Sequence, residues 1–429
     1  MNSREVTGNE FPDSWNVEPL SALNVRRSIT INPAVRTLED FEYYSIPAYQ
    51  ADQRPVVAKG SEIGSAKLLL NEGTILFGKL NPRVEKVWRV GSFTKHRKIG
   101  STEWIPLVPR NDVDPGFLYF LMWSEHVMPK AKTLVSGSTP SRQRVDPRSF
   151  YRIQAPLPPL AEQRKIAVVL ALVQQAKEQQ ERVLAQIAEL KKALLHQLFT
   201  HGLRNEPQKQ TEIGLIPQSW KTSAMEEAGE VVYGIQAAVA SNLKPIGTKI
   251  LTNKNLTLDG DLDLEKINYF ELKTARHKAT LLRKGDLLFN WRSGSKEHVG
   301  KTALFDLDGG YTHSSFILRI RPRDAVTGRF LFYFLKYLRG SGYFVKRHAF
   351  AVNAKFNKSA INQLMVPFPE VTEMAEIVDA LDSIMAKEKL RRRKYAALSA
   401  LFRTLLHELM TARIRVHSFD LSAIEIGRA

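Results

Sequence analysis

Basic, amide and hydroxyl side chains gather in several stretches of this sequence that are rich in turn-forming residues. Arginine and lysine can grip phosphate or bind guanine, asparagine and glutamine pair with adenine, and serine and threonine suit either role. We therefore interpret these stretches as DNA contacts, with a solvated surface as the alternative for any single residue. The candidates are Lys79, Asn81, Arg83, Lys86, Arg142, Gln143, Arg144, Asn290, Arg292, Ser293, Ser295, Lys296, His298, Lys301, Asn353, Lys355 and Lys358.

The charge of the whole chain also favours a polyanionic partner. The 429 residues include 62 Lys+Arg and 44 Asp+Glu, which gives a formal net charge of +18. A membrane surface is the rival anion, but the most apolar runs, at 117–123 and 330–338, fall short of the roughly 20 residues that cross a bilayer. The first residues have no apolar core, so we expect no signal peptide and a cytoplasmic location.

No group of residues predicts a catalytic or metal site. The chain has no cysteine, which excludes disulfides, thiolate metal sites and cysteine nucleophiles. The segment Gly294–Thr302 is similar to a phosphate-binding P-loop, but five residues separate its glycines where the motif needs four. His407 and Glu408 begin a zinc-protease helix motif, but Thr411 stands where the second histidine belongs. We expect no catalytic residue, no metal and no cofactor in this chain.

The elements that must position the candidate DNA contacts come in two copies. The sequence LLHQLFT at Leu194–Thr200 recurs as LLHELMT at Leu405–Thr411, an offset of 405 − 194 = 211 residues. Pro156–Pro158 recurs at the same offset as Pro367–Pro369. Further matches follow the same order at nearly the same offset, which indicates an internal duplication.

Each copy combines a mixed pattern with a long helical one. Short β-branched and aromatic runs between Gly, Pro and Asn predict a globular α/β domain in each copy. Behind the helix entrance at Pro158–Pro159, apolar residues recur at three- and four-residue steps over 166–198, and again over 377–409. These patterns predict helices of about 40 residues, ~60 Å long. The narrow stripe favours an intramolecular antiparallel pair; packing of each helix on its own domain is the alternative.

With these features assembled, the chain resembles the specificity (S) subunit of a type I restriction–modification enzyme. Pro156–Ile166, with the sequence PLPPLAEQRKI, is similar to the family's entrance to its central helix, and Leu190–Phe199 to the end of that helix. Glu212–Trp220 resembles the start of a second target-recognition domain. Ser136–Val145 and Asn290–Lys301 are similar to segments of the first and second recognition domains, respectively. The similarity spans almost the whole chain in family order.

The resemblance implies a mixed α/β fold with pseudo-two-fold symmetry, in which two long antiparallel helices separate two globular target-recognition domains. The expected segments are recognition domain 1 at 1–155, the central conserved helix at 156–203, a linker at 204–214, recognition domain 2 at 215–366, the C-terminal conserved helix at 367–415 and a tail at 416–429.

In function, the resemblance implies that each domain reads one half of a split, asymmetric sequence in double-stranded DNA. Two methylation subunits, which bind S-adenosylmethionine and methylate adenine, would dock on the conserved helical regions, and restriction subunits can join them. ATP and Mg would belong to those partner subunits. The residues implied in partner binding are Pro158, Pro159, Leu160, Glu162 and Gln163.

Two other interpretations of the sequence stay open. The first is a non-catalytic coiled-coil scaffold with general nucleic-acid binding, which salt-dependent binding without sequence preference would support. The second is an enzyme that acts alone, which methylation or cleavage of DNA by the purified chain would establish.

Overall fold

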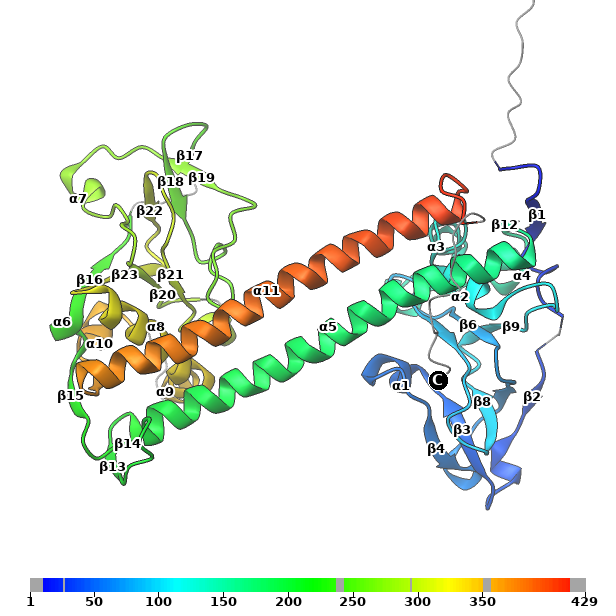
Figure 1. Cartoon of the computed structure of the whole chain (residues 1–429), viewed down its shortest axis with the longest axis horizontal. Helices are drawn as coiled ribbons and strands as arrows, with labels where there is room; N and C mark the ends of the chain where they lie inside the picture. The colour runs from blue at the N-terminus through cyan, green and yellow to red at the C-terminus, as the bar shows by residue number, and fades with distance from the viewer. Residues whose placement is uncertain (1–10, 26–27, 237–242, 294, 350–355, 417–429) are drawn as a thin grey trace, which may run out of the picture. The chain divides into compact units, whose positions relative to one another are not determined.

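The computed structural model describes residues 11–25, 28–236, 243–293, 295–349 and 356–416. The chain divides into two compact units (Figure 1). Unit 1 comprises residues 1–181 and 393–429, and unit 2 comprises residues 182–392. Each unit therefore holds a globular part together with a portion of both long helices, rather than ending where a helix begins. Over the described residues, no helix is both long and apolar enough to span a membrane.

The long helices are α5, at Leu160–His201, and α11, at Val371–Met410. They contain the apolar stripes at 166–198 and 377–409 from which two helices of about 40 residues were predicted. Strand β12 (Gln154–Leu157) runs up to the Pro158–Pro159 entrance of α5. Helix α5 is followed by Gly202, whose left-handed φ of 67° suits a residue without a Cβ. Beyond α11, Ala412 adopts φ 58°, a conformation that costs a residue with a Cβ.

In unit 1, the first half of α5 packs antiparallel against the second half of α11. Ile166 and Leu170 of α5 share one hydrophobic core with Leu409 of α11. Farther along, the Tyr395 hydroxyl donates a hydrogen bond to Glu181 at 2.5 Å. The chain direction is opposite in the two segments, because the lower-numbered residues of α5 meet the higher-numbered residues of α11.

In unit 2, the other halves of the two helices pack in the same antiparallel sense. Leu198 of α5 and Ile377 of α11 are buried in one core. The Lys191 ammonium of α5 forms an ion pair with Glu388 of α11 at 2.5 Å. The predicted intramolecular antiparallel pair is thus confirmed inside each unit, and the helices also pack on the globular parts, as the alternative interpretation supposed.

The globular part of unit 1 is built on two sheets. A five-stranded sheet has the order β2-β5-β8-β3-β4, and a three-stranded sheet has the order β7-β6-β9. Helix α2 (Pro115–Trp123) packs its buried face on the smaller sheet, where Phe117 and Leu121 meet Ile75 and Phe77. The strands are β2 Thr30–Ile31, β3 Asp40–Tyr44, β4 Val56–Lys59, β5 Lys67–Leu69, β6 Ile75–Gly78, β7 Val87–Arg89, β8 Arg97–Gly100 and β9 Trp104–Leu107.

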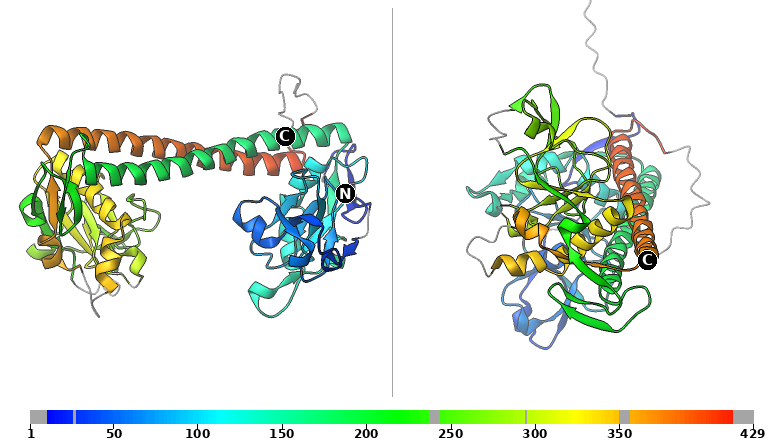
Figure 2. Two further views of the ribbon diagram at one scale, coloured as in Figure 1. Left: turned by 90° about the horizontal axis from the view of Figure 1, so that it is seen from below. Right: turned by 90° about the vertical axis from the view of Figure 1, so that its left-hand side faces the viewer.

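Unit 2 has the same plan with a different distribution of strands. Its two four-stranded sheets have the orders β16-β23-β20-β21 and β17-β19-β18-β22, and they lie to one side of the helix portions of this unit (Figure 2). Helix α8 (Ala325–Gly340) supplies Phe330, Leu331 and Phe334 to the core. The strands are β16 Gly229–Tyr233, β17 Leu243–Lys244, β18 Thr248–Leu251, β19 Asn268–Phe270, β20 Leu287–Asn290, β21 Thr302–Leu304, β22 Tyr311–His313 and β23 Ile317–Pro322.

Shorter elements complete both units. The predicted linker at 204–214 contains most of a hairpin of β13 (Gln208–Thr211) and β14 (Gly214–Pro217) rather than an unstructured connection. The remaining helices are α1 Ile46–Ala51, α3 Met128–Thr133, α4 Pro147–Phe150, α6 Met225–Ala228, α7 Ala275–Lys278, α9 Tyr343–Ala349 and α10 Lys358–Asn362, and the remaining strands are β1 Asn16–Pro19, β10 Val135–Ser136, β11 Arg144–Val145, β15 Lys221–Ala224 and β24 Met365–Phe368.

The duplication predicted from the sequence extends to detailed contacts. In unit 1, β1 pairs antiparallel with β12, and in unit 2, β15 pairs antiparallel with β24. The indole of Trp15 donates to Glu162 at 3.0 Å, and the indole of Trp220 donates to Glu373 at 3.3 Å. Each glutamate lies in the first turn of its long helix. The same strand pair and the same tryptophan contact therefore tie each long helix to the start of its globular domain.

Candidate nucleic-acid interface

The structure brings together the two candidate loops of unit 1. The first loop, residues 79–86, joins the hairpin strands β6 and β7, and the second, residues 137–143, joins β10 and β11. The backbone N–H of Asn81 donates to the carbonyl of Gln143 at 2.8 Å, and that of Val145 donates to the carbonyl of Lys79 at 3.0 Å. An isolated bridge between Leu80 and Arg144 extends this pairing. Two clusters separated by more than 50 residues in the sequence thus form one surface.

Some residues of this surface hold its shape. Lys86 is buried, and its ammonium donates to the carbonyls of Asn81, at 3.2 Å, and Val84, at 2.5 Å. Burial lowers the pKa of Lys86. Arg144 forms a bidentate ion pair with Glu103, at 2.9–3.2 Å, which raises the pKa of the arginine. Lys86 therefore closes the first loop from inside, and Arg144 fixes the second loop to the strand that begins at Trp104.

Other residues of the same surface are exposed or partly exposed, although the Gln143 side chain donates to the carbonyl of Gly137 at 3.3 Å. Arg83 and Arg142 are exposed, and Lys79, Asn81 and Gln143 are half-buried. Asn81 has a left-handed φ of 49°, a conformation that asparagine tolerates better than most residues. Guanidinium groups beside amide side chains on a rigid hairpin are the chemistry of base and phosphate recognition in DNA.

In unit 2, the equivalent hairpin, β20–β21, carries a longer loop at 291–301. Asn290 is fully buried, and its side chain donates to the carbonyl of His298 at 2.8 Å. Lys301 is buried as well, and its ammonium donates to the carbonyls of Asn253, at 2.9 Å, and Leu256, at 2.5 Å. Burial lowers the pKa of Lys301. As placed, both residues support the loop from inside.

The exposed side of this loop presents a cation on an aromatic ring. The guanidinium of Arg292 lies 5.5 Å from the ring centroid of Phe316, an exposed residue, within the range of a cation–π contact. Ser295 is exposed, and Ser293 and His298 are half-buried. Because the ring orients the guanidinium without neutralising it, Arg292 is the candidate of unit 2 best placed to reach an anion or a base.

An aromatic pair links this loop to the segment that contains Lys358. The rings of Trp291 and Tyr233 meet edge to face at 5.6 Å, and the Tyr233 hydroxyl accepts a hydrogen bond from the backbone N–H of Lys358 at 3.0 Å. The indole of Trp291 also donates to the carbonyl of Ser315 at 2.7 Å. The candidates Asn353 and Lys355, and the side chain of Lys296, lie outside the described part of the chain.

The implied partner-binding residues have contacts within unit 1. Gln163 is buried and spans the carbonyls of Asp112, at 3.0 Å, and Pro158, at 2.8 Å, while it accepts from the backbone of Asp114. Glu162 is buried between Trp15 and Arg415, whose guanidinium lies 2.7 Å away. Pro158 is buried, Leu160 is half-buried and Pro159 is exposed. The sequence pattern at this helix entrance is therefore explained in large part by contacts inside the chain.

Two contributors to the surfaces were absent from the sequence prediction. Glu103 pairs with Arg144 from 41 positions away, and Phe316 lies under Arg292 from 24 positions away. No local pattern marks either residue, because the contacts arise from strands that become neighbours only in the folded sheets. Among the described residues, no group of three or more His, Cys, Asp or Glu side chains could hold a metal ion.

Comparisons with known proteins agree with this architecture. Residues 217–400 match the family described as the type I restriction modification DNA specificity domain. The chain is 23% identical to the type I restriction enzyme MjaVIII specificity subunit of Methanocaldococcus jannaschii, over 98% of this chain and 97% of that one. A putative MjaX specificity subunit of the same organism is 28% identical over 183 residues, which is 42% of each chain.

Two solved structures share the fold. The crystal structure of a type I restriction–modification system S subunit from M. genitalium matches with a TM-score of 0.58 and 12% identity, covering 95% of this chain and 98% of that one. A chain from a structural study of the assembly and conformational transition of the type I R-M system matches with a TM-score of 0.54 and 19% identity, covering 93% and 98%.

The fold and its paired loops define a duplicated two-unit protein with basic hairpins. One part of this chain, residues 217–400, matches the type I restriction modification DNA specificity domain, and the chain is similar to a type I specificity subunit over nearly its whole length. The predicted mixed α/β fold with tandem domains and long antiparallel helices is confirmed.

Proposed function

We propose that this chain is the specificity subunit of a type I restriction–modification system and reads a bipartite, asymmetric DNA sequence, with one half read by the loops of unit 1 and the other by the loops of unit 2. The observation that carries the proposal is the repeated hairpin. In each unit a buried lysine supports a loop from inside while an arginine stays exposed on it, Arg83 in unit 1 and Arg292 in unit 2. The surrounding loop sequences differ, so two such units would read different bases.

Within this proposal, the chain selects the DNA and partner subunits modify it. Two methylation subunits, which bind S-adenosylmethionine, would dock on the conserved helical regions and methylate adenine, and restriction subunits that use ATP and Mg can join. The duplicated helix entrances around Glu162 and Glu373 support two docking places of similar shape, because similar surfaces accept copies of one partner. Pro159, exposed at the first entrance, is the residue of that set best placed for contact.

Deletion of the gene tests the proposal directly. Sequencing of methylated adenines in the parent strain is expected to show a bipartite motif that disappears in the deletion strain and returns on complementation. Persistence of every bipartite methyladenine motif in the deletion strain would contradict the proposal. Salt-dependent binding of DNA without sequence preference, with the methylation partners present, would favour the scaffold interpretation instead.

The long helices would set the spacing between the two half-sites. Each is continuous, with 42 residues in α5 and 40 in α11, and each passes from one unit into the other. An insertion of one helical turn near Gln180, matched by one near Arg391, adds about 5.4 Å to each helix. At about 3.4 Å per base pair, the recognised spacer should lengthen by about one or two base pairs with both half-sites unchanged. An unchanged spacer in the methylated motif would eliminate this role of the helices.

A further inference from the structure

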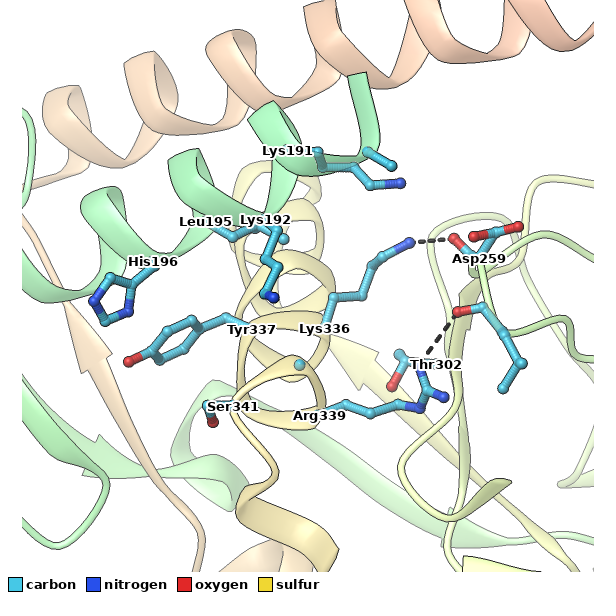
Figure 3. Close-up of a pocket in the computed structure, with 13 residues that line it drawn as sticks. Lys191, Lys192, Leu195, His196, Asp259, Thr302, Lys336, Tyr337, Arg339 and Ser341 are labelled. Carbon is cyan, nitrogen blue, oxygen red and sulfur yellow. Dashed lines mark hydrogen bonds between the residues drawn. The ribbon is translucent and has the colours of Figure 1, made fainter. Parts of the chain in front are cut away.

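A basic pocket in unit 2 is lined by none of the residues proposed to read DNA, although it adjoins the base of the hairpin loop at Thr302. It encloses about 270 Å³ between α5, α8 and the loop around Asp259. Lys191, Lys192 and His196 of α5 line one side (Figure 3). Lys336, Tyr337 and Arg339 of α8 line the other. All of these residues belong to unit 2, so the pocket is a property of that unit alone.

The pocket has an excess of positive charge that its own carboxylate does not neutralise. Asp259 is the one acidic residue among the described residues that line it. Its carboxylate is paired with Arg392 of α11 at 3.0 Å, and only its backbone carbonyl accepts from the Lys336 ammonium. Glu388, which lies close by on α11, is paired with Lys191 and Arg392. The ammonium of Lys336 therefore has a neutral partner where a buried cation is best stabilised by an anion.

The cations of α8 are held in place by backbone oxygens rather than by carboxylates. Arg339 donates to the carbonyl of Glu297 at 3.1 Å, and burial lowers its pKa. Burial, reinforced by the nearby charge of Lys191, lowers the pKa of Lys336 to about 8. Lys192 extends from α5 toward α8 (Figure 3), and it is exposed. Four Lys and Arg side chains thus line a space with one carboxylate, so the lining keeps an excess of positive charge even though Lys191 is paired with Glu388.

We propose that this pocket binds the phosphate group of a small phosphorylated molecule, held by Lys192, Lys336 and Arg339. Ammonium and guanidinium groups are the side chains that bind phosphate most strongly. The rings of His196 and Tyr337, with centroids 6.3 Å apart, offer an aromatic wall for the group that carries the phosphate. The enclosed volume approaches the lower limit for small-ligand sites, and a DNA duplex is far too wide to enter it. Because the ligand bridges α5 and α8, it stabilises unit 2.

Isothermal titration of the full-length chain with pyrophosphate and with adenosine monophosphate, at constant ionic strength, tests the proposal. We expect saturable binding of one molecule per chain. Lys192→Ala should raise the Kd at least tenfold, and Lys336→Met should do the same. The matched control is Lys389→Ala, which removes an exposed lysine of α11 that does not line the pocket. That variant should keep the Kd within twofold of the wild type.

The outcomes separate the alternatives. Lys192 is exposed, so Lys192→Ala should unfold at the wild-type temperature without ligand, and it decides the question even if Lys336→Met fails to fold. The absence of saturable binding by either probe would overturn the proposal. So would equal weakening by Lys192→Ala and Lys389→Ala, which would mark general charge attraction. Displacement of pyrophosphate by a DNA duplex lacking the recognition sequence would also overturn it, and would assign the pocket to DNA phosphates.

Discussion

In both units a buried lysine holds the hairpin loop in place, but the carbonyl groups that it binds lie in different parts of the chain. In unit 1, Lys86 immediately precedes β7 and binds carbonyls of its own loop, at Asn81 and Val84. In unit 2, Lys301 immediately precedes β21 and binds carbonyls of a distant segment, at Asn253 and Leu256. The first lysine closes a short loop on itself. The second fastens a longer loop to the rest of the unit.

This difference shows which structural features the two units share and which features differ between them. The hairpin, its buried lysine and the tryptophan–glutamate contact at the helix entrance occur in both units. The loop length, the residues that face outward and the partners of the lysine differ. A conserved support beneath a variable surface is the arrangement expected of a protein that must read two unlike sequences with one architecture.

The largest expected difference between the units concerns pH. In unit 2, strands β18 and β22 pair in parallel, and His313 of β22 lies opposite Leu251. In unit 1, strands β3 and β8 form a similar parallel pair, in which Gly100 of β8 lies opposite Tyr44. His313 is fully buried, and its Nδ1 lies 3.1 Å from the carbonyl of Ile317, so Nδ1 carries the proton of the neutral ring. Burial, with a further contribution from Arg319, lowers the pKa of His313 to about 3.

Because the folded-state pKa of His313 lies below the ordinary value of 6.5, the unfolded chain takes up a proton that the folded chain does not. Proton uptake by the unfolded chain has no effect on stability above pH 6.5. Between pH 6 and pH 4 it lowers the free energy of unfolding by about 1.4 kcal/mol for each pH unit. The free energy of unfolding of His313→Gln should fall less steeply over that range, by about 3 kcal/mol across two units. If the free energy of unfolding changed equally with pH in the wild type and in His313→Gln, His313 would not titrate in this way.

The next largest effect should come from the helix entrances. Glu373→Ala leaves the fully buried indole of Trp220 and the backbone N–H of Leu203 without their acceptor, at a cost of about 2–4 kcal/mol. Glu162→Ala should cost less, about 1–2 kcal/mol, because only one of its two partners, the indole of Trp15, is buried, whereas Arg415 is partly exposed and water can solvate it. Thermal unfolding, with hydrogen exchange to assign each loss to its unit, measures both. Glu373→Gln, which keeps one acceptor, is the control. Equal losses in both units would contradict this ranking.

A smaller effect is expected from the buried lysines. Lys301→Met removes the cation that joins the 291–301 loop to Asn253 and Leu256, and should lower the free energy of unfolding by about 1 kcal/mol. Hydrogen exchange should increase in both of the segments it joins. Lys86→Met should increase exchange in the 79–86 loop alone. Unchanged hydrogen exchange at 253–256 in Lys301→Met would contradict the role given to Lys301 in joining the two segments.

The smallest expected effect lies at the ends of the long helices. Helix α5 is followed by Gly202, whereas Ala412 takes the left-handed conformation beyond α11. Ala412→Gly should raise the free energy of unfolding by about 0.5–1 kcal/mol, because the strain of a left-handed alanine exceeds the entropy that a glycine loses on folding. Gly202→Ala should have the opposite sign and a larger size, since its Cβ would approach Glu373 within 2.8 Å. Destabilisation by Ala412→Gly would contradict the argument.

The sequence predicted the architecture well because repeats and helical stripes are local signals. The matched segments at 194–200 and 405–411 gave the duplication, and the apolar steps gave α5 and α11. The linker was different: the polar residues 208–211 form strand β13, which pairs with β14 in a hairpin, since side chains that suit a loop also suit a solvated strand. Gly214, with φ 117°, supplies the turn.

The candidate site was predicted less completely, because residue type does not tell where a side chain points. Lys86, Asn290 and Lys301 suit DNA by type, yet the fold buries them and uses their donors to hold carbonyl oxygens. Arg83, Arg142 and Arg292 carry the same chemistry and remain exposed. Glu162 and Gln163 likewise satisfy partners inside unit 1. Only the pairing of distant strands distinguishes a supporting residue from an exposed one.

The central claim is that each unit reads its own half of the DNA sequence. Selection of bound duplexes from a randomised pool, by the chain together with its methylation partners, measures it for the wild type, Arg292→Ala and Arg142→Ala. We predict that Arg292→Ala relaxes the preference at one or two positions of one half-site, at about 1–3 kcal/mol, and leaves the other half unchanged, while Arg142→Ala does the reverse. Relaxation of both halves by either single variant, or a uniform loss of affinity across all sequences, would contradict the account.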